Sequence, residues 1–519
     1  MKKTMRVFRH FEAAPHKSTC DRVTGLGWVT ALTCCVLSGC TVGPKYHAPV
    51  TQAPAAYKES PAKFTDNGPW RVAEPQDAQL RGNWWELFHE PELNALEAQL
   101  NIDNQNIKRY FENFMEARAL VREARSQYFP TFATAPAYSR QRSSANLQNS
   151  QTANVGHEST LYSLPFDISW EPDLWGKVRN EVHAAQYSAQ VSAADLENER
   201  LTEQAALAQY YFEIRGQDAL IQLYADTVAA DKKSLVLTRS QYETGVGDKI
   251  SVIEAQNTLQ SAESIATNLG ILRAQYEHAI AMLVGKAASD FTIPVKPMTT
   301  APPAIPIGVP SQLLQRRPDV AAAERTMAAA NAEIGVADAA YYPTVTLSAA
   351  GGTESSLPQH LFDWPSRFWS IGGSASETIY DGGLRRATVN QYIAIYNADL
   401  ANYQQTVLTA FQQVEDSLAD VRILSQQIEK QRQVVSSAQQ ALQLELARYQ
   451  TGIDPYIDVV TMQTTLLTNQ QTLTSLHIDQ MNGAVQLVEA LGGGWSASQL
   501  PAPSQVAAKP TSAEIKIQQ

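Results

Sequence analysis

Few side chains in this 519-residue sequence have the types and spacing that catalytic or metal chemistry requires. The nine His residues are scattered, without a pair at ligand spacing and without the HExxH pattern of zinc peptidases. P-loop, GxSxG and dinucleotide-binding patterns are absent from the sequence, and "GVGDK" at 245–249 lacks both the preceding strand and the GK[ST] of a phosphate loop. The sequence therefore predicts neither an enzyme nor a resident metal or cofactor.

Cys40 is the residue whose context favours covalent chemistry. Basic residues precede a mostly apolar segment, "VTGLGWVTALTCCVL", which ends in "LSGC" at 37–40. This order describes a signal peptide over residues 1–39, and "LSGC" resembles a bacterial lipobox, whose Cys is acylated and becomes the first residue of the mature chain. The other three Cys residues lie in the removed segment, so the mature chain has no disulfide. We expect a diacylglycerol and an N-acyl chain on Cys40; the alternative is an ordinary signal peptide with a chance Cys.

Charge and composition indicate a solvated, largely helical protein. The net charge of −11 and the lack of a Lys/Arg block argue against a nucleic-acid partner. Residues 384–451 contain neither Gly nor Pro and predict a helix of roughly 100 Å. A matching run over 177–244 contains Gly216 as its only Gly. Helices of this length need partners to bury their apolar stripes, so a coiled-coil-like assembly is expected.

The chain is an internal duplication. Repeat 1 (86–290) and repeat 2 (313–494) have the same landmarks in the same order: an aromatic-Pro-Thr, strand-like segments, a Gly-bearing corner, a long helix, a Tyr-x-Thr-Gly break, a return helix and a small-residue stop. The two Tyr-x-Thr-Gly breaks begin at Tyr242 and Tyr449. A Pro-rich linker (291–312) separates the repeats, an acylated tether (40–85) precedes them, and a tail (495–519) is predicted to be disordered.

Each repeat is predicted to contribute one β-hairpin, near 131–173 and near 344–380. In "LYSLPFDISWEPD" every second residue from Tyr162 to Trp170 is apolar, and the residues between them are polar or Pro. This period of two fits a membrane β-barrel strand, with lipid on one face and water on the other. A half-buried strand of a soluble sheet gives the same pattern. Four strands cannot close a barrel, because membrane barrels begin at about eight strands, so several copies of the chain are required.

Three stretches carry a resemblance to a known family: "CTVGPKYHAP" at 40–49, "WWELFHEPELNAL" at 84–96 and "IPIGVPSQLLQRRPDVAAAE" at 305–324. The chain resembles TolC-like outer-membrane factors of tripartite efflux systems, in the lipoprotein branch (NodT/OprM type). The resemblance implies a mainly α fold with membrane β structure: a homotrimer whose twelve-stranded outer-membrane β-barrel, with four strands per chain, continues into a long periplasmic α-barrel.

The same resemblance implies a function and partners. The chain would be the passive exit duct of a tripartite efflux pump for drugs or other small toxic compounds. It would lie in the bacterial outer membrane, in contact with its lipid, and would meet a periplasmic adaptor and an inner-membrane pump. An exit duct for metal export or type I-like secretion is the alternative within transport. An acylated coiled-coil scaffold without a pore is the alternative from another class.

The resemblance places the helix breaks at the periplasmic tip, where the duct is gated. Tyr449 matches a Tyr of the gate network, Asp458 matches a constricting Asp, and Ser251 stands where the first repeat of TolC has a gate Asp. Asp454 replaces an Arg of TolC, and Thr461 replaces a second constricting Asp, so the closing bonds must differ. In a three-fold tube Asp454 or Asp458 would form a ring of three carboxylates. Such a ring favours cations, and repulsion between its members raises the pKa of the carboxyl groups. Alternatively, Asp454 simply starts the return helix.

The same resemblance implies that the adaptor docks on the turns themselves. The residues concerned are Gly245, Val246 and Gly247 in the first repeat and Gly452 and Ile453 in the second.

Overall fold

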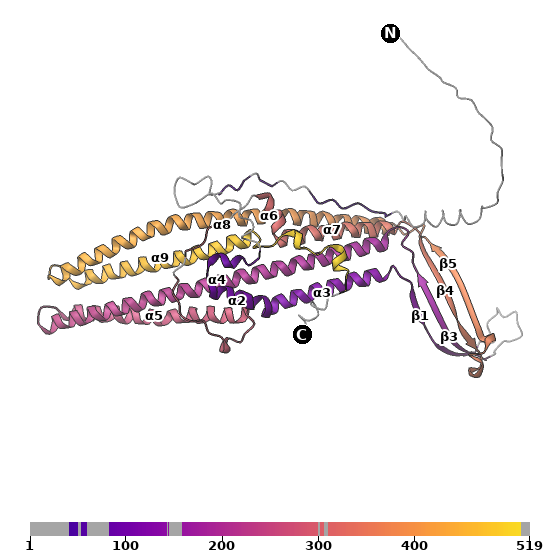
Figure 1. Cartoon of the computed structure of the whole chain (residues 1–519), viewed down its shortest axis with the longest axis horizontal. Coiled ribbons are helices and arrows are strands. Elements are labelled where there is room, and N and C mark those ends of the chain that lie inside the picture. Colours follow the sequence, from indigo (N-terminus) through magenta and orange to yellow (C-terminus); the bar gives the residue numbers. More distant parts are fainter. Residues whose placement is uncertain are drawn as a thin grey trace, which may run out of the picture.

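The computed structural model of the chain describes residues 41–49, 53–54, 56–59, 82–142, 144, 158–298, 301–305 and 310–509. Cys40 and the predicted signal peptide lie outside these residues. The described chain is strongly elongated, with helices along its long axis and a β-sheet at one end (Figure 1).

Two pairs of long antiparallel helices form the body of the molecule. Helix α4 (Lys177–Glu243) is followed by α5 (Lys249–Leu283), and α8 (Leu384–Gln450) by α9 (Tyr456–Ala490). Helices α4 and α8 each have 67 residues, and α5 and α9 each have 35. The equal lengths follow from the duplication, and 67 residues correspond to roughly 100 Å. Both pairs end in a tip remote from the sheet (Figure 1).

Shorter helices lie alongside the pairs. Helices α3 and α7 pack on α4, and α7 also packs on α8. In the described residues, no helix combines the length and the apolarity that a membrane span requires. The shorter elements are η3 (Trp84–Phe88), α2 (Pro91–Asp103), α3 (Gln105–Ser126), η4 (Ala288–Asp290), α6 (Pro310–Arg316), α7 (Pro318–Ala339), η5 (Pro358–His360), η6 (Trp364–Ser366), η7 (Ala497–Gln499) and α10 (Pro503–Val506).

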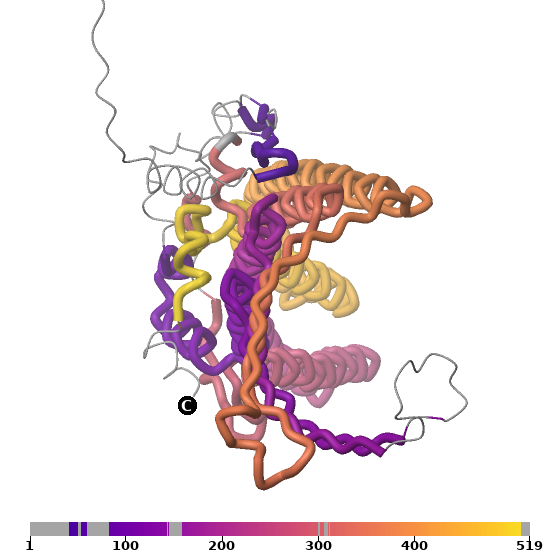
Figure 2. The backbone as a smooth tube through the Cα atoms, turned by 90° about the vertical axis from the view of Figure 1, so that its right-hand side faces the viewer, coloured from indigo at the N-terminus to yellow at the C-terminus, as the bar shows by residue number. Residues whose placement is uncertain are grey.

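The strands form one antiparallel sheet with four strand positions. Its strands are β1 (Thr131–Thr134), β2 (Ala137–Arg142), β3 (Glu158–Trp170), β4 (Thr344–Ser355) and β5 (Arg367–Ser376). Strands β1 and β2 both pair with β3 and occupy one position; β3 pairs with β4, and β4 with β5. The two predicted hairpins therefore join through β3 and β4, the strands of different repeats, and both outer strands keep open edges. Figure 2 shows the strands from the end of the molecule.

The main core lies around the middle of α4, where the N-terminal part of repeat 1 wraps onto it. Trp84, Leu93, Leu207 and Tyr211 are almost completely buried in this cluster. Next to it, the buried Asp218 accepts from the guanidinium of Arg273 at 2.7 Å and from Arg215 at 3.2 Å. Buried carboxylates require such partners, so this network fastens α5 and the chain that follows it to α4.

The predicted disorder of the tail 495–519 is wrong as far as residue 509. Elements η7 and α10 lie in this segment, and the fully buried Val506 packs with Val121 and Ala189. Arg118 donates to the carbonyl oxygen of Ala508 at 3.0 Å. The low-complexity composition concealed these anchors, because their partners lie on α3 and α4, far away in the sequence. Residues 510–519 lie outside the described chain.

Candidate functional site: strand face, N-terminal segment and helix tips

The register of the sheet gathers a continuous apolar band on one face. One row across the strands is Phe132, Ile168, Ala349 and Ile371, and the next is Thr134, Phe166, Gly351 and Trp369. Phe132, Phe166, Trp369 and Ile371 are between 57 % and 79 % exposed. An exposed apolar band of this extent requires a lipid or protein partner.

The opposite face of the same strands has mostly small side chains and is polar. Its residues are mostly Ser, Thr, Ala and Gly, with Asp167 on β3 and Glu354 near the end of β4. Strands β3, β4 and β5 have 13, 12 and 10 residues. A strand of about 9–11 residues spans a bilayer when tilted. Length and the two unlike faces thus fit a barrel wall between lipid and water.

The N-terminal segment starts at the junction between the sheet and the helices. Val42 donates its N–H to the Trp175 carbonyl oxygen at 3.0 Å, and Asn180 returns a side-chain bond to the Val42 carbonyl oxygen at 3.0 Å. A Cβ on Gly43 would lie 2.5 Å from the Cα of Gly335, so this crossing requires glycine. Thr41, the neighbour of Cys40, therefore lies at the helix end of the membrane-compatible strands.

Both helix tips are built as the same glycine turn. Gly245 and Gly452 each have φ of 75°, the left-handed conformation that favours glycine at a helix C-terminus. The N–H of Val246 bonds to the Gln241 carbonyl oxygen at 2.9 Å, and the N–H of Ile453 bonds to that of Arg448 at 3.0 Å. Each turn therefore satisfies the last carbonyl groups of its helix by itself.

The side chains of the turns point outward. Gly247 adds a bond from its N–H to the Gln241 carbonyl oxygen at 2.9 Å. Val246 is 81 % exposed and Ile453 66 % exposed. The predicted docking residues therefore share a geometry, in which glycines bend the backbone and an apolar side chain caps each tip. The docking itself stays a prediction.

Asp454 is paired within its own tip. The Arg448 guanidinium donates from Nη2 to Oδ1 of Asp454 at 2.9 Å and from Nε to Oδ2. These bonds lower the pKa of the Asp454 carboxyl. A ring of repelling carboxylates in an assembly of several copies would raise the pKa of Asp454. Within the single chain, the pairing with Arg448 lowers it instead. The alternative that Asp454 starts the return helix also needs adjustment, because helix α9 begins at Tyr456, two residues later.

Tyr449 joins the two helix pairs. Its hydroxyl donates to Oε1 of Gln241 on α4 at 2.6 Å, and its ring lies 5.2 Å from that of Tyr456 on α9. Tyr449 is only 9 % exposed, whereas its counterpart in the first repeat, Tyr242, is 46 % exposed. Burial, with the nearby acidic groups, raises the pKa of Tyr449. We call this contact between α4–α5 and α8–α9 the tip joint.

The tip joint has an apolar centre and one buried carboxyl. Ala255, Tyr449, Tyr456 and Val459 form the buried cluster. Nearby on α4, Asp231 is 3 % exposed, and its Oδ2 has no hydrogen-bond partner in the described chain. Burial raises the pKa of Asp231 to about 6.

Other predicted gate residues are not brought together in the single chain. Asp458 is exposed in the first turn of α9. Ser251 donates its N–H to Oδ1 of Asp248 at 2.8 Å, an N-cap bond that lowers the pKa of Asp248. Thr461 bonds back to the Ile457 carbonyl oxygen at 2.8 Å. Asp248 is therefore the N-cap of α5 and Ser251 donates to it from the first turn; a role of Ser251 in gating stays a prediction.

The sequence reasoning missed four residues of the tips. Gln241, Arg448, Tyr456 and Asp231 were not singled out, although they contact or lie beside the residues that were. The signal for Arg448 was its distance of six residues from Asp454 across a helix stop. The other three depend on contacts between helix pairs, which the spacing along one helix does not show.

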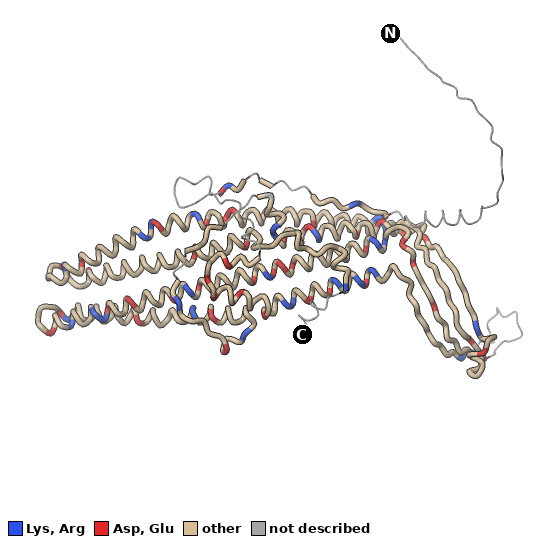
Figure 3. Tube along the Cα trace, viewed as in Figure 1, with Lys and Arg blue, Asp and Glu red and all other residues tan. Residues whose placement is uncertain are grey.

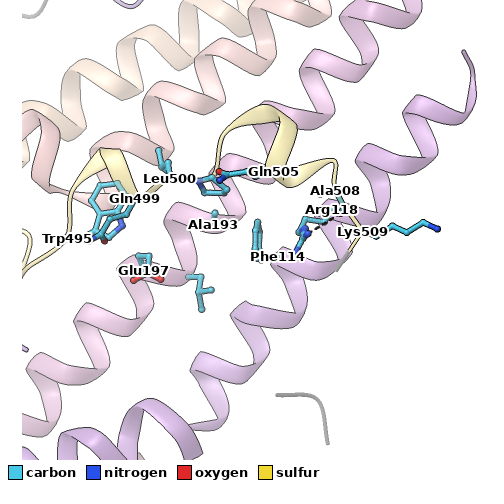
Figure 4. A pocket seen from close by; sticks show the side chains of 12 residues that line it. Phe114, Arg118, Ala193, Glu197, Trp495, Gln499, Leu500, Gln505, Ala508 and Lys509 are labelled. Atoms are coloured by element: carbon cyan, nitrogen blue, oxygen red, sulfur yellow. Dashed lines mark hydrogen bonds between the residues drawn. The ribbon is translucent and has the colours of Figure 1, made fainter. Parts of the chain in front are cut away.

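A cavity of about 500 Å³ lies where the C-terminal segment crosses α3 and α4. Figure 4 shows Phe114, Arg118, Glu197 and Trp495 around it, with the bond from Arg118 to the carbonyl oxygen of Ala508. Burial raises the pKa of Glu197. The described residues contain no group of three or more His, Cys, Asp or Glu that could hold a metal ion. Among these residues the cavity therefore presents no candidate metal centre.

A sheet with one lipid-compatible face, joined to helices of roughly 100 Å, defines an outer-membrane channel of the TolC-like class. The family model described as outer membrane efflux protein matches residues 95–286 and 309–493. The chain belongs to this family. It is a family of ducts rather than of enzymes.

Individual relatives agree with this assignment. The antibiotic efflux pump outer membrane protein ArpC of Pseudomonas putida is 31 % identical over 467 residues, 90 % of this chain and 95 % of that protein. The outer membrane protein OprJ of Pseudomonas aeruginosa is 29 % identical over 485 residues, 91 % of this chain and 97 % of that protein. Among solved structures, the outer-membrane channel OprN matches with a TM-score of 0.79 and 28 % identity, over 88 % of this chain and all of that chain. The predicted family, fold class and outer-membrane location are confirmed.

Proposed function

We propose that the chain is the outer-membrane exit duct of a tripartite efflux pump, which passively conducts drugs or other small toxic compounds out of the cell. The observation that carries the proposal is the two-faced sheet at the end of helix pairs of roughly 100 Å. ArpC is named for antibiotic efflux, and another relative, TtgC of Pseudomonas putida, is named for toluene efflux. The chain spans about 95 % of each of these proteins.

Three copies of the chain form the duct in this proposal. A lipid-exposed sheet cannot keep open edges, because unpaired main-chain groups are costly in hydrocarbon. The β1/β2 edge of one copy must therefore pair with the β5 edge of the next. Four strand positions in each of three copies make twelve strands, an allowed size for a membrane barrel. The Ser- and Thr-rich faces then line a water-filled channel.

The tip joint keeps the periplasmic end closed. Because Tyr449 joins α8 to α4, the two helix pairs cannot separate without losing its bond to Gln241. Asp454 is neutralised by Arg448 within the tip, so Asp458 is left to supply the ring of carboxylates at the mouth. Opening is a movement of one helix pair relative to the other, for which the adaptor and the inner-membrane pump supply the free energy.

The adaptor docks on the exposed apolar tips. Val246 and Ile453 are joined there by Ile250 and Ile457, which are 65 % and 46 % exposed. Exposed β-branched side chains at the end of two helix pairs suit a helical partner that packs end to end with them. Metal export or type I-like secretion with the same architecture stays the alternative, because the duct itself does not identify the pump.

Lipid on Cys40 anchors the duct beside its barrel. Thr41 lies at the junction of sheet and helices, at the level where the periplasmic leaflet would meet the strands. Acyl chains on the preceding residue would reach the bilayer without a spacer. Mass spectrometry of the mature protein should find a diacylglycerol and an N-acyl chain on Cys40, and Cys40→Ser should remove both while leaving the trimer intact.

Conductance in planar bilayers tests the duct directly. The purified protein should give discrete openings of uniform size. A non-pore scaffold would give none, and that outcome would overturn the proposal. Deletion of the gene should raise sensitivity to the compounds expelled by the partner pump, and a plasmid copy should restore resistance.

A further inference from the structure

Charged residues on the apolar face of the sheet are confined to one end. On the described strands, residues that share the face of Phe166 and Ile168 carry four charges: Arg140, Arg142, Glu158 and Arg367. Three of the four are arginines, in a protein whose net charge is −11. All four lie at strand ends remote from the helices, where Figure 3 shows blue segments.

Aromatic side chains mark the border between the apolar band and these charges. The rings of Tyr138 and Tyr162 lie 4.9 Å apart on the same face, one row before Arg140. The Arg367 guanidinium lies 4.1 Å from the centre of the Trp364 ring. Tyr and Trp at such positions are typical of a membrane interface, where an aromatic body meets apolar chains and its polar edge meets water.

The distances along β3 match a bilayer. Trp170 and Tyr162 are eight residues apart, roughly 26 Å along a strand, or about 20 Å of height at a tilt of about 40°. Glu158, opposite Arg142, lies four residues beyond Tyr162, about 10 Å further out. The arginines thus lie just beyond the apolar band, at the depth of lipid headgroups.

We propose that Arg140, Arg142 and Arg367 form an outer rim that binds phosphorylated headgroups of lipids in the external leaflet. The inference rests on the proposed function, which sets this end of the barrel outside the cell. Guanidinium groups bind phosphate through paired N–H donors. Arg140 also contacts Glu158 at 2.6 Å, and this pair leaves the rim with an excess of two positive charges. The charge matches an anionic lipid and does not match a neutral one.

The contact between Arg140 and Glu158 has a competing role as a staple between β2 and β3. An exposed pair of this kind contributes about 0–1 kcal/mol, and the staple explains neither Arg142 nor Arg367. The two roles predict different results for lipid binding. A staple alone predicts no loss of lipid binding when the arginines are replaced by glutamine or lysine, whereas the rim predicts a loss that depends on the substitution. Lysine keeps the charge that attracts phosphate but loses the paired geometry of the guanidinium.

The test measures lipid binding to the purified full-length protein in detergent by native mass spectrometry. The probes are diphosphorylated lipid A and the same lipid after removal of its phosphates. The triple variant R140Q/R142Q/R367Q should bind diphosphorylated lipid A on the order of 100-fold more weakly, from about fivefold for each arginine. The triple lysine variant, which keeps the charge but not the paired donors, should bind more tightly than the glutamine variant and more weakly than the unchanged protein. Arg386→Gln, in the first turn of α8 at the opposite end of the strands from the rim, is the matched control and should bind as the unchanged protein does.

Two results would overturn the proposal that the rim binds phosphorylated headgroups. One is equal binding of the glutamine variant and the unchanged protein; the other is equal binding of phosphorylated and dephosphorylated lipid A by the unchanged protein. Conductance of the same preparations in phosphatidylcholine bilayers separates this proposal from the duct. If the glutamine variant conducts normally but loses lipid A, both proposals stand. If no preparation conducts, the duct fails irrespective of the lipid result.

Discussion

Replacing Tyr449 with Phe should weaken the closed tip without disturbing the fold. The substitution removes one atom, the hydroxyl oxygen whose bond to Gln241 spans 2.6 Å between the helix pairs. The ring, its packing on Tyr456 and the apolar cluster of the tip joint remain. The change therefore isolates one hydrogen bond between α8 and α4.

The magnitude follows from the burial of the pair. A hydrogen bond between neutral, partly buried groups contributes about 1 kcal/mol net. With one such bond in each of three copies, the closed duct loses about 3 kcal/mol relative to the open one, because the open form does not make the bond. That difference corresponds to a shift of the open-to-closed ratio on the order of 100-fold at 25 °C.

Single-channel recording in planar bilayers provides the assay. Tyr449→Phe should raise the open fraction or the conductance at low voltage, and Gln241→Ala should have a similar effect. In cells without the partner pump, the same variants should admit a large antibiotic that the closed duct excludes. Combining Tyr449→Phe with Gln241→Ala should add little, because both remove the same bond.

The internal duplication supplies a matched control. Tyr242 occupies the position of Tyr449 in the first repeat, but it is 46 % exposed, against 9 % for Tyr449. Tyr242→Phe should therefore leave the open fraction unchanged. If Tyr449→Phe and Tyr242→Phe have the same effect on the open fraction, whether both leave it unchanged or both raise it, the tip joint does not close the duct.

Three further predictions concern the membrane face, the buried carboxyl and the tips. Phe166→Lys places a charge on the lipid face and should destabilise the membrane-inserted barrel by about 2–4 kcal/mol, which lowers the amount of folded protein in membrane fractions. Asp167→Lys, one residue away on the channel face, should assemble normally. Burial raises the pKa of Asp231 from 3.8 to about 6, so ionisation of this carboxyl destabilises the packed joint. This cost is absent below about pH 4, grows as the pH rises through 6 and is constant above. Asp231→Asn should therefore raise the melting temperature at pH 8 and not at pH 4, and equal shifts at both pH values would contradict the assignment. The double change of Val246 and Ile453 to Asp should lower adaptor affinity at least tenfold in a pull-down with the purified adaptor, while conductance stays unchanged; a normal affinity would remove the tips from the docking surface.

Much of the architecture was predictable because it depends on local pattern and on the duplication. The lack of Gly and Pro over 384–451 set the length of α8, and the glycines at 245 and 452 marked both turns. Alternating polarity from Tyr162 to Trp170 identified the face that meets lipid. The tail was predicted wrongly, since composition does not reveal that Val506 finds a buried site against α3 and α4.

The site was less predictable, because its contacts join segments far apart in the chain. Tyr449 and Asp454 were singled out by resemblance, yet the partners Gln241 and Arg448 were not. The equivalent tyrosines of the two repeats share the Tyr-x-Thr-Gly pattern, and this pattern does not distinguish the buried Tyr449 from the exposed Tyr242.

The sequence by itself determined the elements of this protein: two repeats, paired long helices and strands with one apolar face. Those features depend on side-chain periodicity and on the backbone preferences of Gly and Pro, which act over a few residues. Only the tertiary structure decided that β3 pairs with β4 across the repeats and that α8 meets α4 at the tip. Packing brings such segments together through interactions of many residues at once, and no single stretch of sequence contains that information.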